Sequence, residues 1–562
     1  MIVLGVNDNH DASAALVIDG EVAAAVGQER IDRIKNSSLF PWDAMDEVLR
    51  IGGVRPGDVD QVVFGSHFTP STALRRYPHT HQSVKKRGGQ FSPMLNAYVL
   101  YQVALRASGT WEAEAASSRR LLTRRLGRYG YRAPVTTMDH HLGHAASAYL
   151  SQTRDTSLVL TVDAMGDGTS VTVGAARGGR IELLYRQSGL AAINTYYSRI
   201  TEYLGFRPLR HEGKVTGLAA YVEPPPELLE HFRDELHFTG VGFNLKNYAR
   251  WPRMDDAFHR FLESYSREEI ASACQRNLEQ QVCRFVRTWV RRSGIRDLAV
   301  AGGLFANVKL NQRIHDLDEV DSLFVYPNMG DGGLAAGSAL LLAGAEPGRL
   351  KDVYLGPEYG DRDCEQALRR EGLAFERPGD LAGEVAELLV NSKVVARFDG
   401  RMEWGPRALG NRTLLYRPDD RSVNDWLNER LGRTEFMPFA PVTQWEHADR
   451  CYRQLEGARD AARFMTVCFD CTDWMRRVGS GVVHVDGTAR PQLLRRADNP
   501  AYHDILEAYR RLTGNPSLIN TSFNMHEEPI VRSPADAVRG FLAGNLDHLI
   551  LGPFLVRHPN SR

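Results

Sequence analysis

The chain has 562 residues, of which 43% are hydrophobic and 25% are charged, and its mean hydropathy is -0.35. This length exceeds one ordinary hydrophobic core, so we expect a soluble globular protein of about two to four domains. The 69 Lys and Arg residues balance 69 Asp and Glu residues, which excludes a global basic field for nucleic acid but leaves room for a local basic patch.

The cysteines and the N-terminus indicate the compartment. Six cysteines are scattered, and the Cys468-x-x-Cys471 pair has no second pair to complete a zinc site. The N-terminus opens with apolar residues but has no basic region before them, so we interpret it as folded structure rather than a signal peptide. Because no apolar run approaches about eighteen residues, we expect a cytoplasmic protein with no membrane partner.

The first elements are a strand, a polar loop and a hairpin. The loop Asn7–Asp11 follows a buried-type strand, and Ala14–Ile18 then pairs with Glu21–Val26 across an Asp-Gly turn. Actin-type ATPases and sugar kinases begin in this way. In the loop, His10 is a candidate general base, and a turn histidine is the alternative.

Residues 75–89 form the most basic segment, with Lys85, Lys86 and Arg87 together. Two interpretations stay open for this segment. It is a mobile surface loop, or it meets an anionic substrate.

A helix is predicted from Asp139, whose carboxylate is a plausible N-cap. His140 and His144 lie four positions apart and project from one face of this helix, a spacing that lets two imidazoles hold one metal ion. The alternative is a pair of histidines that found ordinary hydrogen-bond partners.

Acidic residues follow two predicted strands. A β-branched strand runs into Asp163 and then into the turn Gly166-Asp167-Gly168, where backbone N–H groups can meet a phosphate and carboxylates can hold a cation. A plain hairpin turn is the alternative, and it does not explain Asp163. The strand Ser322–Tyr326 leads to Asp331 and repeats this arrangement.

Two glycine-containing loops between these acids are candidate nucleotide contacts. Lys214 enters a helix from a glycine-spaced polar loop and either steadies a phosphate or lies in solvent. The strand Asp297–Val300 is followed by Gly302, Gly303 and Asn307, and paired glycines let a nucleotide approach the backbone. A lone Gly-Gly pair is a weak signal.

The composition of residues 345–349 is typical of a linker, so we place a domain boundary there and predict domains 1–345 and 346–562. In the second domain, Arg401, Arg407 and Arg412 are held by Gly and Pro turns and are a candidate polyanion cradle. Surface arginines are the alternative. Further candidate contacts follow at Arg433, Arg490, Asn520 and Ser522.

Four motifs in this order resemble the O-carbamoyltransferase family of antibiotic and nodulation-factor biosynthesis, which includes tobramycin-type enzymes. The motifs are HDASAAL at 10–16, the His140/His144 pair, GRMEWGPRALGNR at 400–412 and NTSFN at 520–524. The resemblance covers essentially the whole chain. It implies an α/β protein with a duplicated actin/sugar-kinase-like (ASKHA) domain at 1–345 and a YrdC-like domain at 346–562.

The resemblance also implies roles for single residues. It places the metal on His140, His144, Asp163 and Asp331 and the proton acceptor on His10. It places the activation site at Arg407, Arg490, Asn520 and Ser522, while the match at Arg433 is looser. Two imidazoles with two carboxylates suit Fe(II), Mn(II) or Zn(II). We name Lys214 as a further catalytic candidate and Asp167 as a further cofactor contact.

The implied reaction uses ATP, with Mg(II), and carbamoyl phosphate to form carbamoyl adenylate and pyrophosphate. The adenosine would rest on Gly302, Gly303 and Asn307, and the carbamoyl group would pass to the hydroxyl of a small molecule. Two alternatives are a small-molecule kinase of the same superfamily and a tRNA threonylcarbamoylation-type protein. The neutral pI weighs against the second, so no nucleic-acid partner is expected, and a homodimer stays open.

The acceptor is the least defined part of this hypothesis. Residues 222–265 are rich in acids and aromatics, which favours a polycationic aminoglycoside sugar over a polyketide or macrolide alcohol. The alternative is a solvated acidic face above an ordinary aromatic core.

Overall fold

A computed structural model describes residues 1–77, 93–246, 256–432 and 436–560. The chain forms two compact units, of which unit 1 comprises Met1–Gln28 and Asn36–Leu350, and unit 2 comprises Glu29–Lys35 and Lys351–Arg562. The domain boundary predicted from the sequence was 345/346. Nothing in the sequence indicated that residues 29–35 pack with the second unit.

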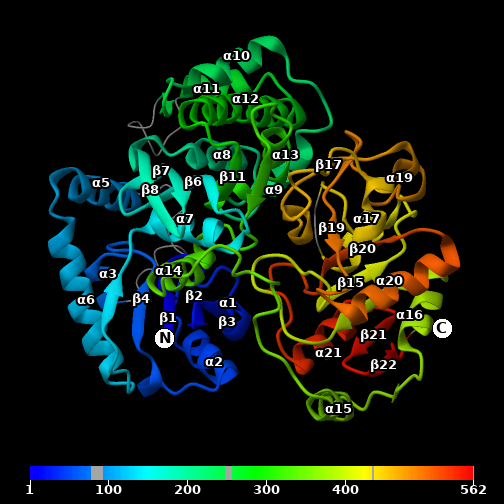
Figure 1. The fold of residues 1–562 in the computed structure, drawn as a ribbon. Helices are drawn as coiled ribbons and strands as arrows, with labels where there is room; N and C mark the ends of the chain where they lie inside the picture. The colour runs from blue at the N-terminus through cyan, green and yellow to red at the C-terminus, as the bar shows by residue number, and fades with distance from the viewer. Residues whose placement is uncertain (78–92, 247–255, 433–435, 561–562) are drawn as a thin grey trace. The chain divides into compact units, whose positions relative to one another are not determined.

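Unit 1 contains two five-stranded sheets of the same topology, in the orders β3-β2-β1-β4-β5 and β8-β7-β6-β11-β12 (Figure 1). In each sheet three antiparallel strands are followed by two parallel ones. This repetition confirms the predicted duplicated α/β fold. The strands are β1 (Ile2–Asn7), β2 (Ser13–Ile18), β3 (Glu21–Gly27), β4 (Gln61–Phe64), β5 (Val135–Thr137), β6 (Thr156–Gly166), β7 (Thr169–Arg177), β8 (Arg180–Ser188), β11 (Asp297–Ala301) and β12 (Ser322–Val325).

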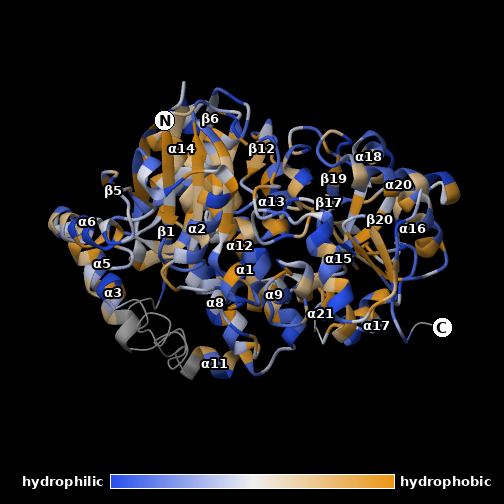
Figure 2. Cartoon of the chain, turned by 90° about the horizontal axis from the view of Figure 1, so that it is seen from below, coloured by the Kyte–Doolittle hydropathy of each residue, from blue (hydrophilic) through white to orange (hydrophobic). Residues whose placement is uncertain are grey.

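Two helices between these sheets form the centre of unit 1. Helix α7 (His140–Ser151) follows β5 but packs on β6 and β11, whereas α14 (Leu334–Leu342) follows β12 but packs on β1 and β2. The helices touch where glycines leave room, since a Cβ on Gly337 would lie 2.2 Å from the carbonyl oxygen of Gly143. Hydrophobic residues concentrate on α14 and on central strands such as β1 (Figure 2). The exchange of helices brings the ends of both sheets to one place.

Predicted local elements are confirmed in this unit. Strands β2 and β3 pair across Asp19 and Gly20, as the Asp-Gly turn indicated. Helix α7 begins at His140, and the carboxylate of its N-cap Asp139 accepts the Leu142 N–H at 3.2 Å. The other α-helices that the structure describes in unit 1 include α2 (Trp42–Gly52), α3 (Thr72–Arg76), α5 (Pro93–Ser108), α6 (Trp111–Gly127), α8 (Ile193–Tyr203), α9 (Glu212–Leu218), α10 (Pro226–Glu235), α11 (Asp256–Leu262), α12 (Arg267–Ser293) and α13 (Val308–His315), with a small sheet of β9 (Leu236–Phe238) and β10 (Phe243–Leu245).

Unit 2 is built on a mixed eight-stranded sheet of order β13-β22-β21-β14-β15-β20-β16-β19. Helices α16 (Leu381–Val390) and α20 (Pro500–Thr513) pack together over a core that includes Val395, Leu415 and Ile550. Side chains alternate along a strand, so Phe398 points to the other face, where α21 (Pro534–Ala543) lies. The sheet strands are β13 (Phe375–Glu376), β14 (Val395–Phe398), β15 (Arg412–Tyr416), β16 (Ala440–Gln444), β19 (Gln492–Leu494), β20 (Ser517–Ser522), β21 (His548–Leu551) and β22 (Phe554–Arg557). The remaining helices and strands include α1 (Gln28–Asp32), α15 (Asp361–Arg370), α17 (Val423–Arg430), α18 (Ala448–Cys451), β17 (Phe469–Asp470), α19 (Asp473–Val478) and β18 (Thr488–Ala489).

The segment 29–35 belongs to unit 2 through buried and half-buried arginines. The guanidinium of Arg30 donates to Gly405 O at 2.9 Å. The guanidinium of Arg33 donates to Pro529 O and Ile530 O, both at 2.7 Å. Carbonyl contacts of this kind depend on tertiary structure, which is why a charge run in the sequence did not reveal them.

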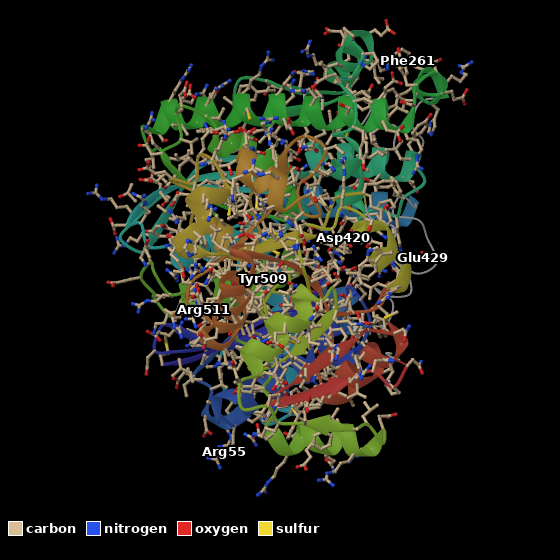
Figure 3. All side chains as sticks on the ribbon, turned by 90° about the vertical axis from the view of Figure 1, so that its right-hand side faces the viewer. Arg55, Phe261, Asp420, Glu429, Tyr509 and Arg511 are labelled. Atoms are coloured by element: carbon tan, nitrogen blue, oxygen red, sulfur yellow. The ribbon has the colours of Figure 1, made fainter. Side chains whose placement is uncertain are left out.

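Charged residues on the surface are often paired. Arg55 bonds Asp58 in unit 1 and Arg511 bonds Glu507 in unit 2, and both arginines project outward (Figure 3). In the described part of the chain, every helix is too short or too polar to cross a membrane.

Candidate functional site

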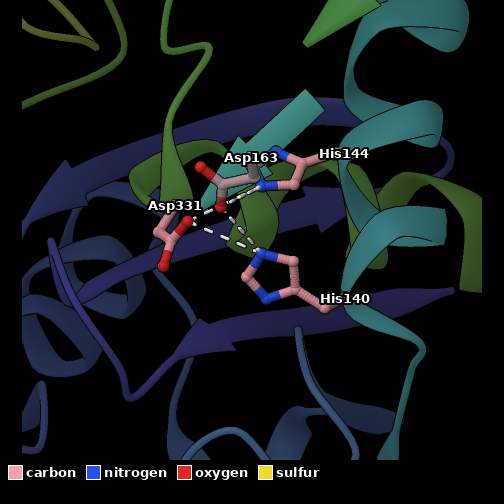
Figure 4. Close-up of side chains that lie close together, drawn as sticks. All are labelled: His140, His144, Asp163 and Asp331. Carbon is pink, nitrogen blue, oxygen red and sulfur yellow. Dashed lines mark hydrogen bonds and ion pairs between the residues drawn. The ribbon is translucent and has the colours of Figure 1, made fainter. Parts of the chain in front are cut away.

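Two histidines and two aspartates from three elements converge in unit 1 (Figure 4). Helix α7 supplies His140 and His144, β6 supplies Asp163, and the turn before α14 supplies Asp331. From Asp163 Oδ2 the His140 Nε2 is 3.3 Å away and the His144 Nε2 3.6 Å, and both nitrogens lie 3.6 Å from Asp331 Oδ1. One ligand atom from each residue lies within 4.8 Å of the others, so the quartet can hold a metal ion.

Strand β6 presents Asp163 because its pairing with β7 is interrupted. The register shifts between Val162 and Gly166, so Asp163 leaves the ladder. Beyond the shift, Asp167 and Gly168 form the turn into β7. From the sequence, a phosphate-binding loop and a hairpin turn were alternative predictions for Gly166–Gly168. In the structure these residues form a hairpin turn between β6 and β7, and the register shift before the turn explains the position of Asp163.

The four side chains of the quartet are buried, so each charge or polar atom among them needs a partner. Both histidines are 0% exposed and both aspartates 8% exposed. Neither ring nitrogen of His144 has a hydrogen-bond partner within the described residues, and leaving a buried polar group unsatisfied is costly. A divalent cation between the rings and the carboxylates would remove this cost. The residues present therefore fit a metal ion.

The pKa values reflect the same crowding. Burial lowers the pKa of His140, but the carboxylates of Asp331 and Asp163 outweigh it and raise that pKa to about 9. Burial also raises the pKa of Asp163, and contacts with His140 and His144 outweigh this effect and hold the pKa well below its usual range. Without metal, the imidazolium and the carboxylates compensate one another.

We therefore expect metal binding to release protons near neutral pH. His140 stays protonated up to a pKa of about 9 without metal, and a ligating nitrogen must lose its proton. Metal affinity should then rise with pH up to about 9 and level off above it. Calorimetric titration at pH 7 in two buffers of different ionisation enthalpy measures the protons released. Equal heats in both buffers, or an affinity independent of pH, would contradict this expectation.

Three neighbours orient the quartet. Ser66 Oγ lies 2.9 Å from His140 Nδ1, and the Gly303 N–H donates to Asp163 Oδ1 at 3.1 Å. Asn9 Nδ2 donates to Asp331 Oδ2 at 3.2 Å. Sequence reasoning missed Ser66 and Asn9, and the only signal was the position of Asn9 within the polar loop after the first strand.

His141 lies beside the quartet but is not part of it. Its Nδ1 is 2.6 Å from Thr161 Oγ1 and its Nε2 is 3.0 Å from Thr169 O. Burial lowers its pKa to about 3, so the ring is neutral. Its hydrogen bonds anchor α7 to the second sheet.

Asp167, which was predicted to contact a cofactor, has hydrogen-bond partners within the protein. Its side chain is 0% exposed, and its carboxylate accepts the N–H groups of His67, Phe68 and His140 at 2.8 to 3.0 Å. Thr69 Oγ1 donates to it as well, at 3.2 Å. Through these four donors the carboxylate holds the start of α7, and its contact with a cofactor stays a prediction.

The candidate base and the candidate lysine lie in different surroundings. His10 is partly exposed in the loop after β1, next to Asn9, and its Nε2 is 3.5 Å from Asp11 Oδ2. Lys214 lies in α9 and is 4% exposed, with its ammonium 5.8 Å from the centroid of the Phe206 ring. A solvent-exposed Lys214 is therefore excluded, and its catalytic role stays a prediction.

The two paired glycines have different structural roles: Gly302 allows a close approach of the backbone, and Gly303 holds the candidate metal ligand Asp163. Gly302 has φ 105°, and a Cβ there would lie 2.3 Å from Val162 O, so only glycine fits. Gly303 holds Asp163, as described above. Asn307 caps α13 by accepting the Leu310 N–H at 3.0 Å, and its Nδ2 donates to Gln275 Oε1 at 2.8 Å. Contact of these residues with adenosine stays a prediction.

Several acids and aromatics of residues 222–265, the stretch predicted to favour an aminoglycoside acceptor, contact other parts of the protein. Phe232 and Phe243 are buried core residues. Glu223 is bonded by Arg276, and Asp234 lies 3.6 Å from Lys246. Acids paired within the protein and aromatics in its core match the alternative interpretation. Tyr248, Trp251 and Asp255 lie outside the described residues.

In unit 2, the loop that carries Arg407 is fastened to the sheet by its carbonyl groups. Ala408 O accepts from Asn520 Nδ2 at 3.2 Å, and Leu409 O accepts from Gln492 Nε2 at 2.8 Å. Asn520 Nδ2 also donates to Gln492 Oε1 at 2.6 Å. Three segments distant in sequence therefore meet beside Arg407.

Asn520 acts inside this junction. It is 1% exposed and also accepts a hydrogen bond from Thr413 Oγ1, so it supports the Arg407 loop, and its contact with a nucleotide stays a prediction. Arg490 and Ser522 are partly exposed and lie two positions along the chain from Gln492 and Asn520 respectively. Arg433 lies outside the described residues.

The three arginines of the 400–412 motif do not form one cradle. Arg412 is 0% exposed and donates to Asp399 O and Asn411 O, both at 2.8 Å. Arg401 donates to Leu355 O at 2.7 Å. A residue that sequence reasoning missed organises the loop: Glu403 Oε1 accepts the N–H groups of Leu409, Asn411 and Arg412. Of the three arginines, Arg407 remains the candidate for an anion.

The basic segment 75–89 is only partly described. Arg75 is buried against Asp8, so neither a mobile loop nor an anionic substrate accounts for it. Residues 78–89, including Lys85, Lys86 and Arg87, lie outside the described residues.

Comparison with known proteins gives matches over the whole chain. Residues 2–340 match the family described as Carbamoyltransferase N-terminus, and residues 386–558 match Carbamoyltransferase C-terminus. Nodulation protein NolNO of Sinorhizobium fredii is 32% identical over 98% of this chain and 79% of its own length. Nodulation protein NolO of Bradyrhizobium diazoefficiens is 34% identical over 75% of this chain and 79% of its own length. A solved structure, component A of the (R)-2-hydroxyglutaryl-CoA dehydratase of Acidaminococcus fermentans, covers 61% of this chain and is itself 99% covered, at 13% identity and a TM-score of 0.33, too low to support an inference.

Proposed function

The chain belongs to the carbamoyltransferase family, and we propose that it moves a carbamoyl group, activated as carbamoyl adenylate, to a hydroxyl of a small molecule. The observation that carries the proposal is the buried quartet of unit 1, in which an unsatisfied His144 faces two carboxylates. Such a donor set suits Fe(II), and Mn(II) or Zn(II) are the alternatives.

Activation is assigned to unit 2. Water converts carbamoyl phosphate to carbamate and phosphate, and a carbamate oxygen then attacks the α-phosphorus of ATP, so that pyrophosphate leaves and carbamoyl adenylate forms. Arg407 and Arg490 would neutralise the phosphates, together with Mg(II). The Ser522 hydroxyl is a third contact. The hydrogen bonds among Asn520, Gln492 and the Arg407 loop support this assignment because they fix that loop in place.

Transfer is assigned to unit 1. His10 would accept the proton of the acceptor hydroxyl while the hydroxyl oxygen attacks the carbamoyl carbon. AMP then leaves with the electron pair of the broken C–O bond. A bound divalent metal would supply a positive charge that polarises the carbamoyl carbonyl. Ser66, Asn9 and Gly303 hold the surrounding side chains in place, and Gly302, Gly303 and Asn307 are the proposed adenosine contacts.

The acceptor is proposed only as an alcohol of a small molecule. The preference for an aminoglycoside over a polyketide alcohol stays a prediction, because acids of residues 222–265 such as Glu223 and Asp234 already pair with basic residues and Phe232 and Phe243 are buried. Aminoglycosides and polyketide alcohols should therefore be tested side by side as acceptors. The class on which a carbamate forms is the acceptor class.

The test of activation needs neither acceptor nor transfer. Purified protein with ATP, Mg(II) and carbamoyl phosphate should release pyrophosphate, and omission of carbamoyl phosphate should stop the release. A kinase would instead form ADP when given a sugar. ADP formation, or pyrophosphate release that does not depend on carbamoyl phosphate, would contradict the proposal.

A further inference from the structure

Arg75 is a completely buried guanidinium near the quartet. Its side chain is 0% exposed, and its Nε and Nη2 donate to the two carboxylate oxygens of Asp8 at 2.9 and 3.1 Å. Nη2 also donates to Ser66 O and Nη1 to His67 O, each at 3.0 Å. A planar fork of donors makes these contacts at once, which the single ammonium of lysine does not.

The two segments that Arg75 joins each carry a contact to a candidate metal ligand. They leave the ends of β1 and β4, which are neighbouring parallel strands. On the first segment, Asn9 follows Asp8 and donates to Asp331 Oδ2. On the second, Ser66 Oγ meets His140 Nδ1. One side chain thus fastens the supports of two ligands.

The two supports set the orientation of the atoms that would face a metal. Asn9 engages Asp331 Oδ2, which leaves Oδ1 toward the histidines. Ser66 Oγ lies beside Nδ1 of His140, and in the tautomer that binds a metal it would accept a hydrogen bond from Nδ1–H, which leaves the lone pair of Nε2 for the ion. Within the described residues Arg75 hydrogen-bonds none of the four candidate ligands, so any effect on them passes through its neighbours.

We propose that Arg75 is a positioning residue of the metal centre, which sets metal affinity by locking the Asn9 and Ser66 segments together. The inference rests on the proposed metal centre. It does not depend on the substrate, because the effect is on the quartet itself.

Co(II) titrated into the metal-free full-length protein is the probe, since its visible absorption reports both affinity and coordination geometry. Arg75→Lys keeps the positive charge beside Asp8 but loses the fork, and it should weaken Co(II) binding about tenfold or more and alter the spectrum. The matched control is Arg463→Lys, which changes another buried arginine bonded through Nε and Nη2 to one carboxylate, that of Asp498 in unit 2. The control should bind Co(II) as the wild type does.

A double-mutant cycle distinguishes positioning from general loosening. Ser66→Ala should weaken Co(II) binding, and Arg75→Lys with Ser66→Ala should weaken it by less than the product of the two single losses, because Arg75 acts partly through Ser66. If circular dichroism shows that Arg75→Lys is unfolded, Asp8→Asn replaces it, and the double-mutant cycle is made with Asn9→Ala. Asp8→Asn keeps the hydrogen bonds from Arg75 to Ser66 O and His67 O.

Two results would overturn the inference. One is wild-type affinity and spectrum in folded Arg75→Lys, and the other is strictly multiplicative losses in the cycle. Failure of the proposed metal centre gives a different result. Wild-type protein would then not bind Co(II), or His140→Ala would bind it normally, and both the metal centre and the role of Arg75 would be wrong.

Discussion

His140→Ala should reduce carbamoyl transfer about 10³-fold while pyrophosphate release persists. A metal that polarises a carbonyl supplies several kcal/mol of transition-state stabilisation, and about 4 kcal/mol corresponds to this loss. His140 approaches both carboxylates, so its removal dismantles the quartet. The residues proposed for activation lie in unit 2, outside the quartet. Metal content, carbamate formation and pyrophosphate release, measured on the same preparation, check the expectation.

The neighbouring histidine is the matched control for this variant. His141→Gln changes an equally buried imidazole of α7 whose two nitrogens bond Thr161 and Thr169 rather than the aspartates. It should keep its metal, although its thermal stability should fall. If folded His140→Ala also loses carbamoyl-phosphate-dependent pyrophosphate release, the division of steps between the units is wrong.

Arg407→Ala should lower pyrophosphate release roughly ten- to 150-fold. Loss of a charge-assisted contact costs about 1.5–3 kcal/mol, which sets this range. Arg407→Lys should also lose activity, because a planar fork and a point charge bind phosphate oxygens differently. Pyrophosphate release with saturating ATP and carbamoyl phosphate is the measurement. Carbamoyl transfer from preformed carbamoyl adenylate should be unchanged.

An exposed arginine of unit 2 controls for the loss of charge. Arg511 pairs with Glu507 at the surface of α20, and Arg511→Ala should release pyrophosphate at the wild-type rate. Normal pyrophosphate release by Arg407→Ala would remove Arg407 from the activation site and leave Arg490 as the candidate.

The candidate site shows where sequence reasoning succeeds and where it stops. The turn between β2 and β3 and the start of α7 were predictable, because turn chemistry and helix capping act over a few residues. The convergence of Asp163 and Asp331 on the histidines was expected only from the resemblance to a family. Spacing along the chain does not reveal it, since the strand order of two sheets brings these residues together.

Several polar residues were assigned to ligands because a polar residue in a glycine-rich loop looks the same in sequence whether it faces a ligand or the protein. Asp167, Asn520 and Arg412 turned out to be buried and bonded to neighbouring groups. Their partners lie on other segments, and only the packed chain shows which donors and acceptors are already satisfied.

By itself, the sequence of this protein determined the local elements, because these depend on residue types at short, regular spacings, and its motifs showed the resemblance to a family that implied four candidate metal ligands. The tertiary structure alone decided the supports of the site. Asn9, Ser66 and Arg75 become neighbours of the quartet only when β1 and β4 lie side by side and α7 packs across the second sheet. A hydrogen bond needs its two atoms within about 3 Å in a defined direction. Such proximity between distant segments is a property of the completed fold.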